Sequence, residues 1–239
     1  MHIPDGYLSP QTAVPFLVLM VPVWRVAVKR VKENLKKKDV PVLAIGAAFA
    51  FTIMMFNLPI PGGSSAHAVG AVLLAILLGP WAACLGVSVA LIIQALIFGD
   101  GGILAIGANC FNMGFLMPMI GYYVYKVIKG GADEASGRAI VAAVAAGYVG
   151  LNAAALCTAL EFGLQYSLFQ AADGTPLYFP YPLQVAVTAM MSEHLLLAGP
   201  VEAIVTALGL RFVVSSHPEL LAGQRLIKTY GKKEVAGNV

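Results

Sequence analysis

Charged side chains are scarce in this chain. They make up 11% of its 239 residues, whereas hydrophobic residues make up 59% and the mean hydropathy is +0.81. Soluble domains carry about 25% charged residues, because their surfaces face water. The composition therefore excludes a soluble domain and predicts an integral membrane protein. The small net charge of +3 does not point to nucleic acid as a partner.

Cysteine pairs and a nucleotide-binding loop are also lacking. Cys84, Cys110 and Cys157 are scattered without CxxC spacing, which argues against a disulfide framework and fits small apolar contacts between helices. No G-x-x-x-x-G-K-[ST] motif occurs, and the nearest stretch, YGKKE, has neither the loop nor the Ser or Thr. The sequence therefore predicts no ATPase activity of its own, and any energy must come from partners.

Long apolar runs dominate what is present. All but one are at least about as long as a helix needs to be to cross a bilayer, and the helix-stopping pair Gly79-Pro80 separates the shortest run from the next one. They predict an all-α bundle of seven transmembrane helices, with residues 1–239 forming a single domain. The runs cover residues 12–28, 40–58, 67–79, 81–98, 103–125, 139–170 and 183–214.

The distribution of basic residues predicts the orientation. The cluster at residues 25–38 should be cytoplasmic by the positive-inside rule, and with seven spans all 15 basic residues fall on that side. Residues 1–11 then form an outer tail and residues 215–239 a cytoplasmic tail of a multi-pass protein in the cell membrane. No basic residue precedes the first apolar run, so we expect an uncleaved anchor that leaves Met1 outside.

The first two residues could chelate a metal. The α-amine of Met1, the amide nitrogen of His2 and its imidazole Nδ1 can close fused five- and six-membered rings in nearly one plane. Ni(II) and Cu(II) accept such a flat nitrogen set, Co(II) is a weaker candidate, and Zn(II) prefers a tetrahedron. The simpler alternative is a solvated terminal histidine.

The stretch PIPGGSSAHAVG can complete that set. Ser64 or Ser65 is expected to cap the next helix and His67 to lie in its first turn, on the outer side, where it offers a fourth nitrogen. Pro4-Asp5-Gly6 predicts a turn that folds the tail over the bundle, with Asp5 accepting a hydrogen bond from the remote nitrogen of His2. A hydrogen-bonded structural role for His67 is the alternative.

Several motifs together resemble a known family. MHIPDGYLSP, PIPGGSSAHAVG, LLGPWAACLG, LIIQALIFGDGGILAIGANCFNMG and HLLLAGPVEAIVT are similar to the substrate-binding S component of nickel/cobalt energy-coupling-factor (ECF) transporters. The resemblance extends from Met1 to Leu210. It implies a square-planar site made by the Met1 amine, the amide and imidazole nitrogens of His2, and the imidazole of His67.

The resemblance also implies a substrate and partners. Cobalt-associated members usually begin Met-His-Ile-Met-Glu-Gly, whereas MHIPDG is the form of nickel members. High-affinity Ni(II) capture is therefore implied, with Co(II) tolerated and no organic cofactor. The implied partners are a transmembrane coupling subunit, two cytoplasmic ATPases and, in some systems, a small accessory membrane subunit.

Other polar residues leave two function classes open. Glu161, Glu193 and His194 lie in predicted helices, where ionisable groups are costly, and Glu161 could pair with His194 or join it in a proton relay. A self-sufficient secondary metal-ion transporter would need internal repeats, and none is clear. An intramembrane serine hydrolase could pair Ser64 or Ser65 with His194, but no oxyanion site is readable.

Overall fold

Helices form most of the chain, as predicted. The computed structural model describes residues 1–60, 64–218 and 220–221, so most of the predicted cytoplasmic tail, 215–239, lies outside the described residues. The first half contains α1 (Pro10–Asn34), the 3₁₀ turn η1 (Lys37–Asp39), α2 (Val40–Met54), β1 (Leu58–Ile60), β2 (Ser64–Ala66), α3 (Ala71–Leu78), α4 (Pro80–Ile93) and η2 (Gln94–Phe98). The second half contains α5 (Ile106–Asn109), η3 (Cys110–Leu116), α6 (Met117–Lys129), α7 (Gly137–Leu168), α8 (Leu183–Glu193), η4 (His194–Ala198) and α9 (Gly199–Ser216).

Four helical stretches are long and apolar enough to cross a membrane. They are residues Pro10–Asn34, Pro80–Phe98, Gly137–Leu168 and Leu183–Ser216. The chain is therefore a multi-pass membrane protein. The count of seven spans and the orientation of the termini stay predictions, because α2 and α3 have only 15 and 8 residues.

Local sequence signals explain where several helices begin and end. Ser9 caps α1, since its hydroxyl accepts from the Thr12 amide at 3.2 Å, and Pro10 occupies the first helical position. Gly79, at φ +91°, ends α3, and Pro80 begins α4. The predicted break at Gly79-Pro80 is confirmed.

The segment that carries His67 differs from the prediction. Ser64 and Ser65 do not cap a helix, because they lie in β2, which pairs antiparallel with β1 from Leu58 opposite Ala66 to Ile60 opposite Ser64. His67 follows β2 in an extended segment, and α3 begins only at Ala71. The fold is thus helical with one short hairpin, and the expected capped helix from residue 67 is wrong.

A distant carboxylate caps α3 in place of the serines. Glu202, fully buried in α9, accepts from the Val69 amide at 2.7 Å and from the Gly70 amide at 2.9 Å. Gly70 has a φ of +73°, the left-handed region that an L side chain rarely adopts. The turn into α3 is therefore held by Glu202 and permitted by Gly70, and no local sequence signal points to the role of Glu202.

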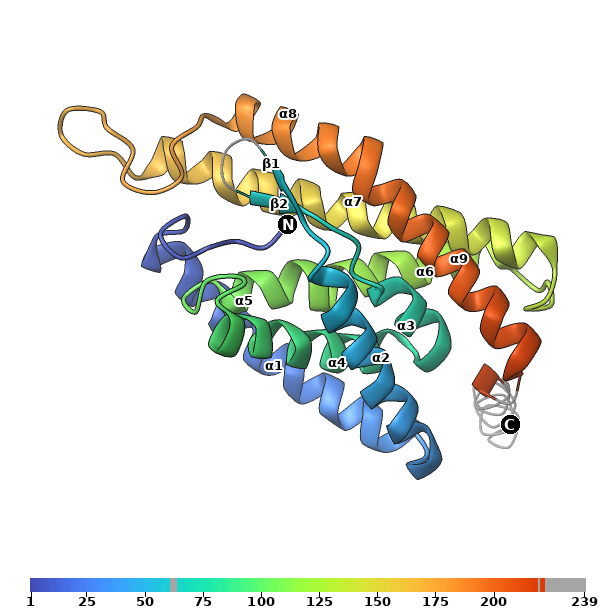
Figure 1. The fold of residues 1–239 in the computed structure, drawn as a ribbon. Coiled ribbons are helices and arrows are strands. Elements are labelled where there is room, and N and C mark those ends of the chain that lie inside the picture. Colours follow the sequence, from blue (N-terminus) through green and yellow to red (C-terminus); the bar gives the residue numbers. More distant parts are fainter. Residues whose placement is uncertain (61–63, 219, 222–239) are drawn as a thin grey trace, which may run out of the picture.

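Small residues let neighbouring helices approach each other closely. A Cβ on Gly147 would lie 3.0 Å from the Glu202 carbonyl and 3.1 Å from the Ala203 Cα of α9. One on Gly107 in α5 would overlap the backbone of Leu17 in α1. Figure 1 also shows where the chain begins and where its last long helix ends. The N-terminus lies inside the outline of the bundle beside β2, whereas α9 ends at the far side.

Candidate metal centre

The N-terminal tail is locked into the bundle at Ile3. The Ile3 amide donates to Asn109 Oδ1 at 2.9 Å, and the Asn109 Nδ2 donates back to the Ile3 carbonyl at 3.2 Å. The Gly102 amide donates to the same carbonyl at 2.8 Å. Met1 and Ile3 are both fully buried. Because the main chain is held on both sides of residue 3, the two residues before it have a fixed position.

The turn after Ile3 forms as predicted, but Asp5 has a different partner. Gly6 has a φ of +85°, as a turn glycine should. The Asp5 carboxylate accepts from the Ile103 and Leu104 amides, each at 3.0 Å. The expected bond from Asp5 to His2 is therefore wrong, because the loop after η2 offers two free amides to that carboxylate.

Gln94 takes the place expected for Asp5. His2 Nε2 lies 3.2 Å from Gln94 Oε1, and an amide oxygen can only accept, so Nε2 carries the proton. The lone pair is then on Nδ1, the nitrogen that the chelate needs. Nδ1 is buried without a hydrogen-bond partner and lies 3.4 Å from Asp100 Oδ1.

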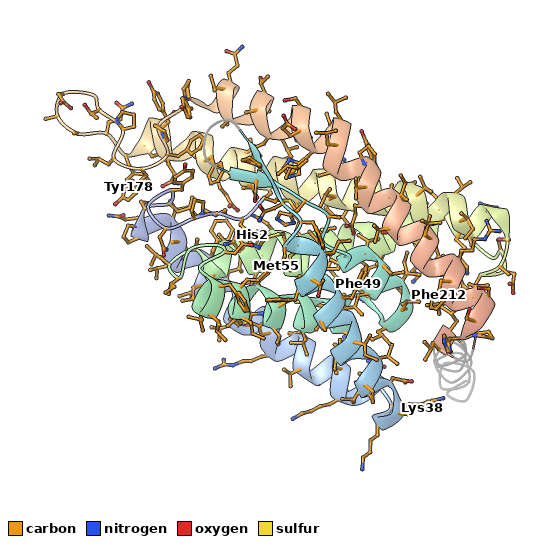
Figure 2. All side chains as sticks on the ribbon, viewed as in Figure 1. His2, Lys38, Phe49, Met55, Tyr178 and Phe212 are labelled. Carbon is orange, nitrogen blue, oxygen red and sulfur yellow. The ribbon has the colours of Figure 1, made fainter. Side chains whose placement is uncertain are left out.

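His67 shows the same division between its two nitrogens. Its Nδ1 lies 3.0 Å from the Ala68 carbonyl, which fixes the proton there, and its Nε2 is buried without a partner. The ring stacks on that of His2, with centroids 4.6 Å apart and planes inclined by 27°. Figure 2 shows His2 in the interior of the bundle, on the tail below the hairpin.

Burial keeps all three groups neutral. It lowers the pKa of the Met1 amine from 8.0 to about 4, against a smaller opposite effect of Asp100. Burial and then the nearby terminal charge lower the pKa of His2 to about 3, and the same two causes lower that of His67 well below its usual range. At neutral pH His2 and Asp100 therefore do not form an ion pair. Each nitrogen offers a lone pair without first losing a proton.

Ser64 and Ser65 line the same site. The Met1 amine donates to Ser65 Oγ at 3.1 Å, and Ser64 Oγ donates to the His2 carbonyl at 3.4 Å. The hairpin thus contacts the tail on the side where His67 leaves β2. Both serines support the tail, although the capping role predicted for them is not formed.

The side chains alone do not make a metal site here. Among the described residues, no group of three or more His, Cys, Asp and Glu side chains is arranged to hold a metal ion. A metal here must therefore use the terminal amine or an amide as well as the two imidazoles. The two rings that carry the unpartnered nitrogens have centroids 4.6 Å apart.

Glu161 and His194 have separate partners. Glu161 accepts from Asn112 Nδ2 at 2.9 Å and from Cys157 Sγ at 3.6 Å. His194 Nδ1 lies 2.7 Å from the Met190 carbonyl, within its own helix. Glu193 is half-buried beside it in the sequence. Glu161 and His194 make these contacts in place of the pair suggested by the sequence.

Comparisons with known proteins agree with the metal chemistry of this site. A family model named CbiM, described as cobalt uptake substrate-specific transmembrane region, matches residues 2–220. The "Fused nickel transport protein NikMN" of Rhodobacter capsulatus is 53% identical over 225 residues, which are 94% of this chain and 65% of that protein. The "Probable fused nickel transport protein LarMN" of Lactiplantibacillus plantarum is 53% identical over 91% of this chain and 66% of its own length.

A solved structure has the same fold. The crystal structure of a truncated transition metal transporter superposes with a TM-score of 0.86 at 57% identity, covering 91% of this chain and all of that one. The chain spans just under two thirds of the length of the two fused nickel transport proteins.

Proposed function

Because the chain belongs to the CbiM family of cobalt uptake substrate-specific transmembrane regions, we propose that it captures Ni(II) with high affinity for import. The ligands are the Met1 amine, the amide nitrogen and Nδ1 of His2, and Nε2 of His67. The observation that carries this proposal is the burial of two unpartnered imidazole lone pairs beside a neutral amine. Burying polar atoms without partners costs free energy, which a bound ion would recover.

The proposed coordination is square planar. The Met1 amine, the His2 amide and His2 Nδ1 occupy three corners, because they belong to two consecutive residues and close fused rings. Nε2 of His67, whose ring stacks on that of His2, supplies the fourth corner. Ni(II) favours four nitrogens in a plane, and Co(II) is the secondary substrate. The amide must lose its proton on binding, so capture releases protons and weakens in acid.

We propose that the chain works as the S component of an ATP-driven ECF importer. Its sequence lacks a nucleotide-binding loop, so ATP hydrolysis must occur in other chains. The proposed partners are a transmembrane coupling subunit and two cytoplasmic ATPases, with a small accessory membrane subunit. The longer relatives are named as fused proteins, which supports a partner segment beyond the part that matches this chain.

The test uses the terminal amine. Two glycines placed before Met1 move the amine away while keeping every side chain. One glycine would be a poor test, because an amine, two amides and the histidine would themselves form a four-nitrogen chelate. The measurement is the absorption spectrum and calorimetric titration of the purified full chain with Ni(II).

We expect the unextended chain to give a yellow, diamagnetic complex and the extended chain to lose it. Two glycines added after Val239 are the matched control and should change nothing. His67→Ala should also weaken binding, whereas His217→Ala should not. An extended chain that binds Ni(II) as tightly, with the same spectrum, would contradict the proposed site, and a secondary carrier or a hydrolase would then be reconsidered.

A further inference from the structure

A pocket lies at the junction of four helices, where α1 and α3 end, α4 begins and α6 runs alongside. Its volume is about 360 Å³, which is large enough for a small-molecule group. The Gly79-Pro80 turn forms one wall, and a Cβ on Gly79 would meet no atom within 4 Å. None of the lining residues belongs to the proposed metal site, so this pocket needs an explanation of its own.

Both charged residues that line the pocket are basic. Arg30 comes from α1 and Lys126 from α6, and no Asp or Glu of the described residues lines it. Glu33 near the end of α1 and Glu134 after α6 are paired with other lysines. Within the described part of the chain, neither Arg30 nor Lys126 forms an ion pair. The pocket therefore holds two positive charges that no acidic side chain of that part compensates.

Two aromatic side chains place this pocket at a boundary between charged and apolar surface. Trp81 of α4 and Tyr122 of α6 line it, and Lys126 Nζ lies 5.5 Å from the centroid of the Tyr122 ring, in a cation–π contact. Trp and Tyr gather where a bilayer meets water, at the depth of the lipid head groups. Val127, next to Lys126, is 78% exposed and offers apolar surface to lipid tails.

We propose that this pocket binds the phosphodiester group of an anionic phospholipid. The Arg30 guanidinium can donate two parallel hydrogen bonds to phosphate oxygens, and the Lys126 ammonium adds a compact positive charge. Basic pockets between transmembrane helices bind lipid head groups in this way. A free phosphate ion carries the same charge, but it has no acyl chains to lie against the apolar surface beside the pocket. The inference does not rest on the proposed function, because the two sites share no residue.

The test measures lipid binding by the purified full chain in a non-ionic detergent. Dioleoylphosphatidylglycerol is the anionic probe, dioleoylphosphatidylcholine the zwitterionic probe and inorganic phosphate the soluble one. Native mass spectrometry counts the bound lipid at each concentration. Thermal unfolding reports the stabilisation that a ligand of the folded state gives.

The variants separate this pocket from the basic surface around it. Arg30→Gln combined with Lys126→Gln removes both charges from the pocket. Lys32→Gln combined with Lys38→Gln is the matched control, because both lysines are exposed, lie at or just after the end of α1 and do not line the pocket. The two variants lose the same charge, so a difference between them belongs to the pocket.

We expect the unchanged chain to bind phosphatidylglycerol at least about tenfold more tightly than phosphatidylcholine and to unfold at a higher temperature with it. Each basic residue near an anionic lipid is worth about fivefold, so the pocket variant should bind phosphatidylglycerol roughly thirtyfold less tightly. The control should stay within about threefold of the unchanged chain, because exposed charges away from the site are screened.

Three results would overturn the proposal. Equal binding of the two lipids would show no preference for an anionic head group. An equal loss in the pocket variant and the control would show that diffuse surface charge attracts the lipid. Inorganic phosphate that displaces phosphatidylglycerol and stabilises the chain as much would show a site for the free ion.

Single variants cover the case in which the double pocket variant fails to fold, which circular dichroism would reveal. Arg30→Gln and Lys126→Gln should each weaken phosphatidylglycerol binding by about fivefold. Single variants that bind this lipid as tightly as the unchanged chain would equally overturn the proposal.

Discussion

The buried amine of Met1 makes docking of the tail dependent on pH. In the undocked tail the amine has a pKa near 8.0 and His2 one near 6.5, and in the docked tail burial lowers these values to about 4 and about 3. Between each pair of values the undocked tail binds a proton that the docked tail does not. Docking is therefore strongest above pH 8 and weakens as the pH falls toward 4.

We predict that acidification from pH 8 to pH 5 exposes residues 1–9 of the metal-free protein. The amine alone changes the docking free energy by about 1.4 kcal/mol per pH unit in this window, and His2 adds to it below its undocked pKa. Hydrogen exchange, corrected for the intrinsic rate at each pH, should show loss of protection at the Ile3 amide. Residues 80–90 of α4 are the control, and equal protection of the tail at both pH values would contradict the prediction.

The sequence predicted the cluster of Met1, His2 and His67 better than the contacts that support it. Met1, His2 and His67 could be proposed from the sequence, because the chelate depends on neighbours along the chain and on one histidine after an outer loop. The structure brings the three together, while their binding of metal stays a prediction. The sequence predicts Asp5 as the hydrogen-bond partner of His2, because the two residues lie close together along the chain. The structure shows Gln94 in that role, and Gln94 comes from a distant part of the sequence.

The short helix α3 depends on a carboxylate from another element. It has eight residues, too few to be stable without packing and capping, and Glu202 binds the two amides before it. Since these amides belong to Val69 and Gly70, the same carboxylate also fixes the backbone just after His67. The position of His67 is therefore coupled to α9.

We predict that Glu202→Gln destabilises the protein by about 1 to 3 kcal/mol, because one acceptor oxygen becomes a donor facing an amide. It should also weaken Ni(II) binding, since His67 loses its fixed backbone. Thermal unfolding in detergent and Ni(II) titration measure the two effects. Glu33→Gln, at a partly exposed site near the end of α1, is the control, and unchanged stability in Glu202→Gln would show that the cap is unimportant.

Local signals located breaks between elements but not the hairpin. Gly79-Pro80 stops a helix whatever surrounds it, so that prediction is confirmed. Ser64 and Ser65 also fit a helix cap, and nothing nearby in the sequence shows that the cap is supplied by Glu202, more than 130 residues later. The start of α3 at Ala71 thus depends on a contact with a distant residue, which a local pattern cannot reveal.

At the scale of the whole molecule, the basic end and the loop after α7 lie far apart. Figure 2 shows Lys38 and Tyr178 at opposite ends of the bundle. Hydropathy and the basic cluster were enough to predict a multi-pass membrane protein, since both depend on composition. The number of spans is harder to predict, because α2 and α3 are shorter than the bilayer is thick.

We predict that the loop after α7 faces outward and the turn after α1 faces the cytoplasm. A cysteine replacing the exposed Asp173 should react with a membrane-impermeant maleimide in intact cells. One replacing Lys37 should react only after permeabilisation. The half-buried Cys157 is changed to Ser in both, and the parent without either new cysteine is the control. The reverse labelling pattern would show that the orientation is opposite to the predicted one.

The segment η4 also sets the phase between the two halves of its helix. A π turn holds one residue more than an α turn, so it acts as a one-residue insertion between His194 and Glu202. If residues 194–198 instead continued as regular α-helix, everything after them would be turned by roughly 100° further about the axis. The Glu202 carboxylate would then leave the Val69 and Gly70 amides, so the π turn absorbs the extra residue and lets α9 hold the backbone just after His67.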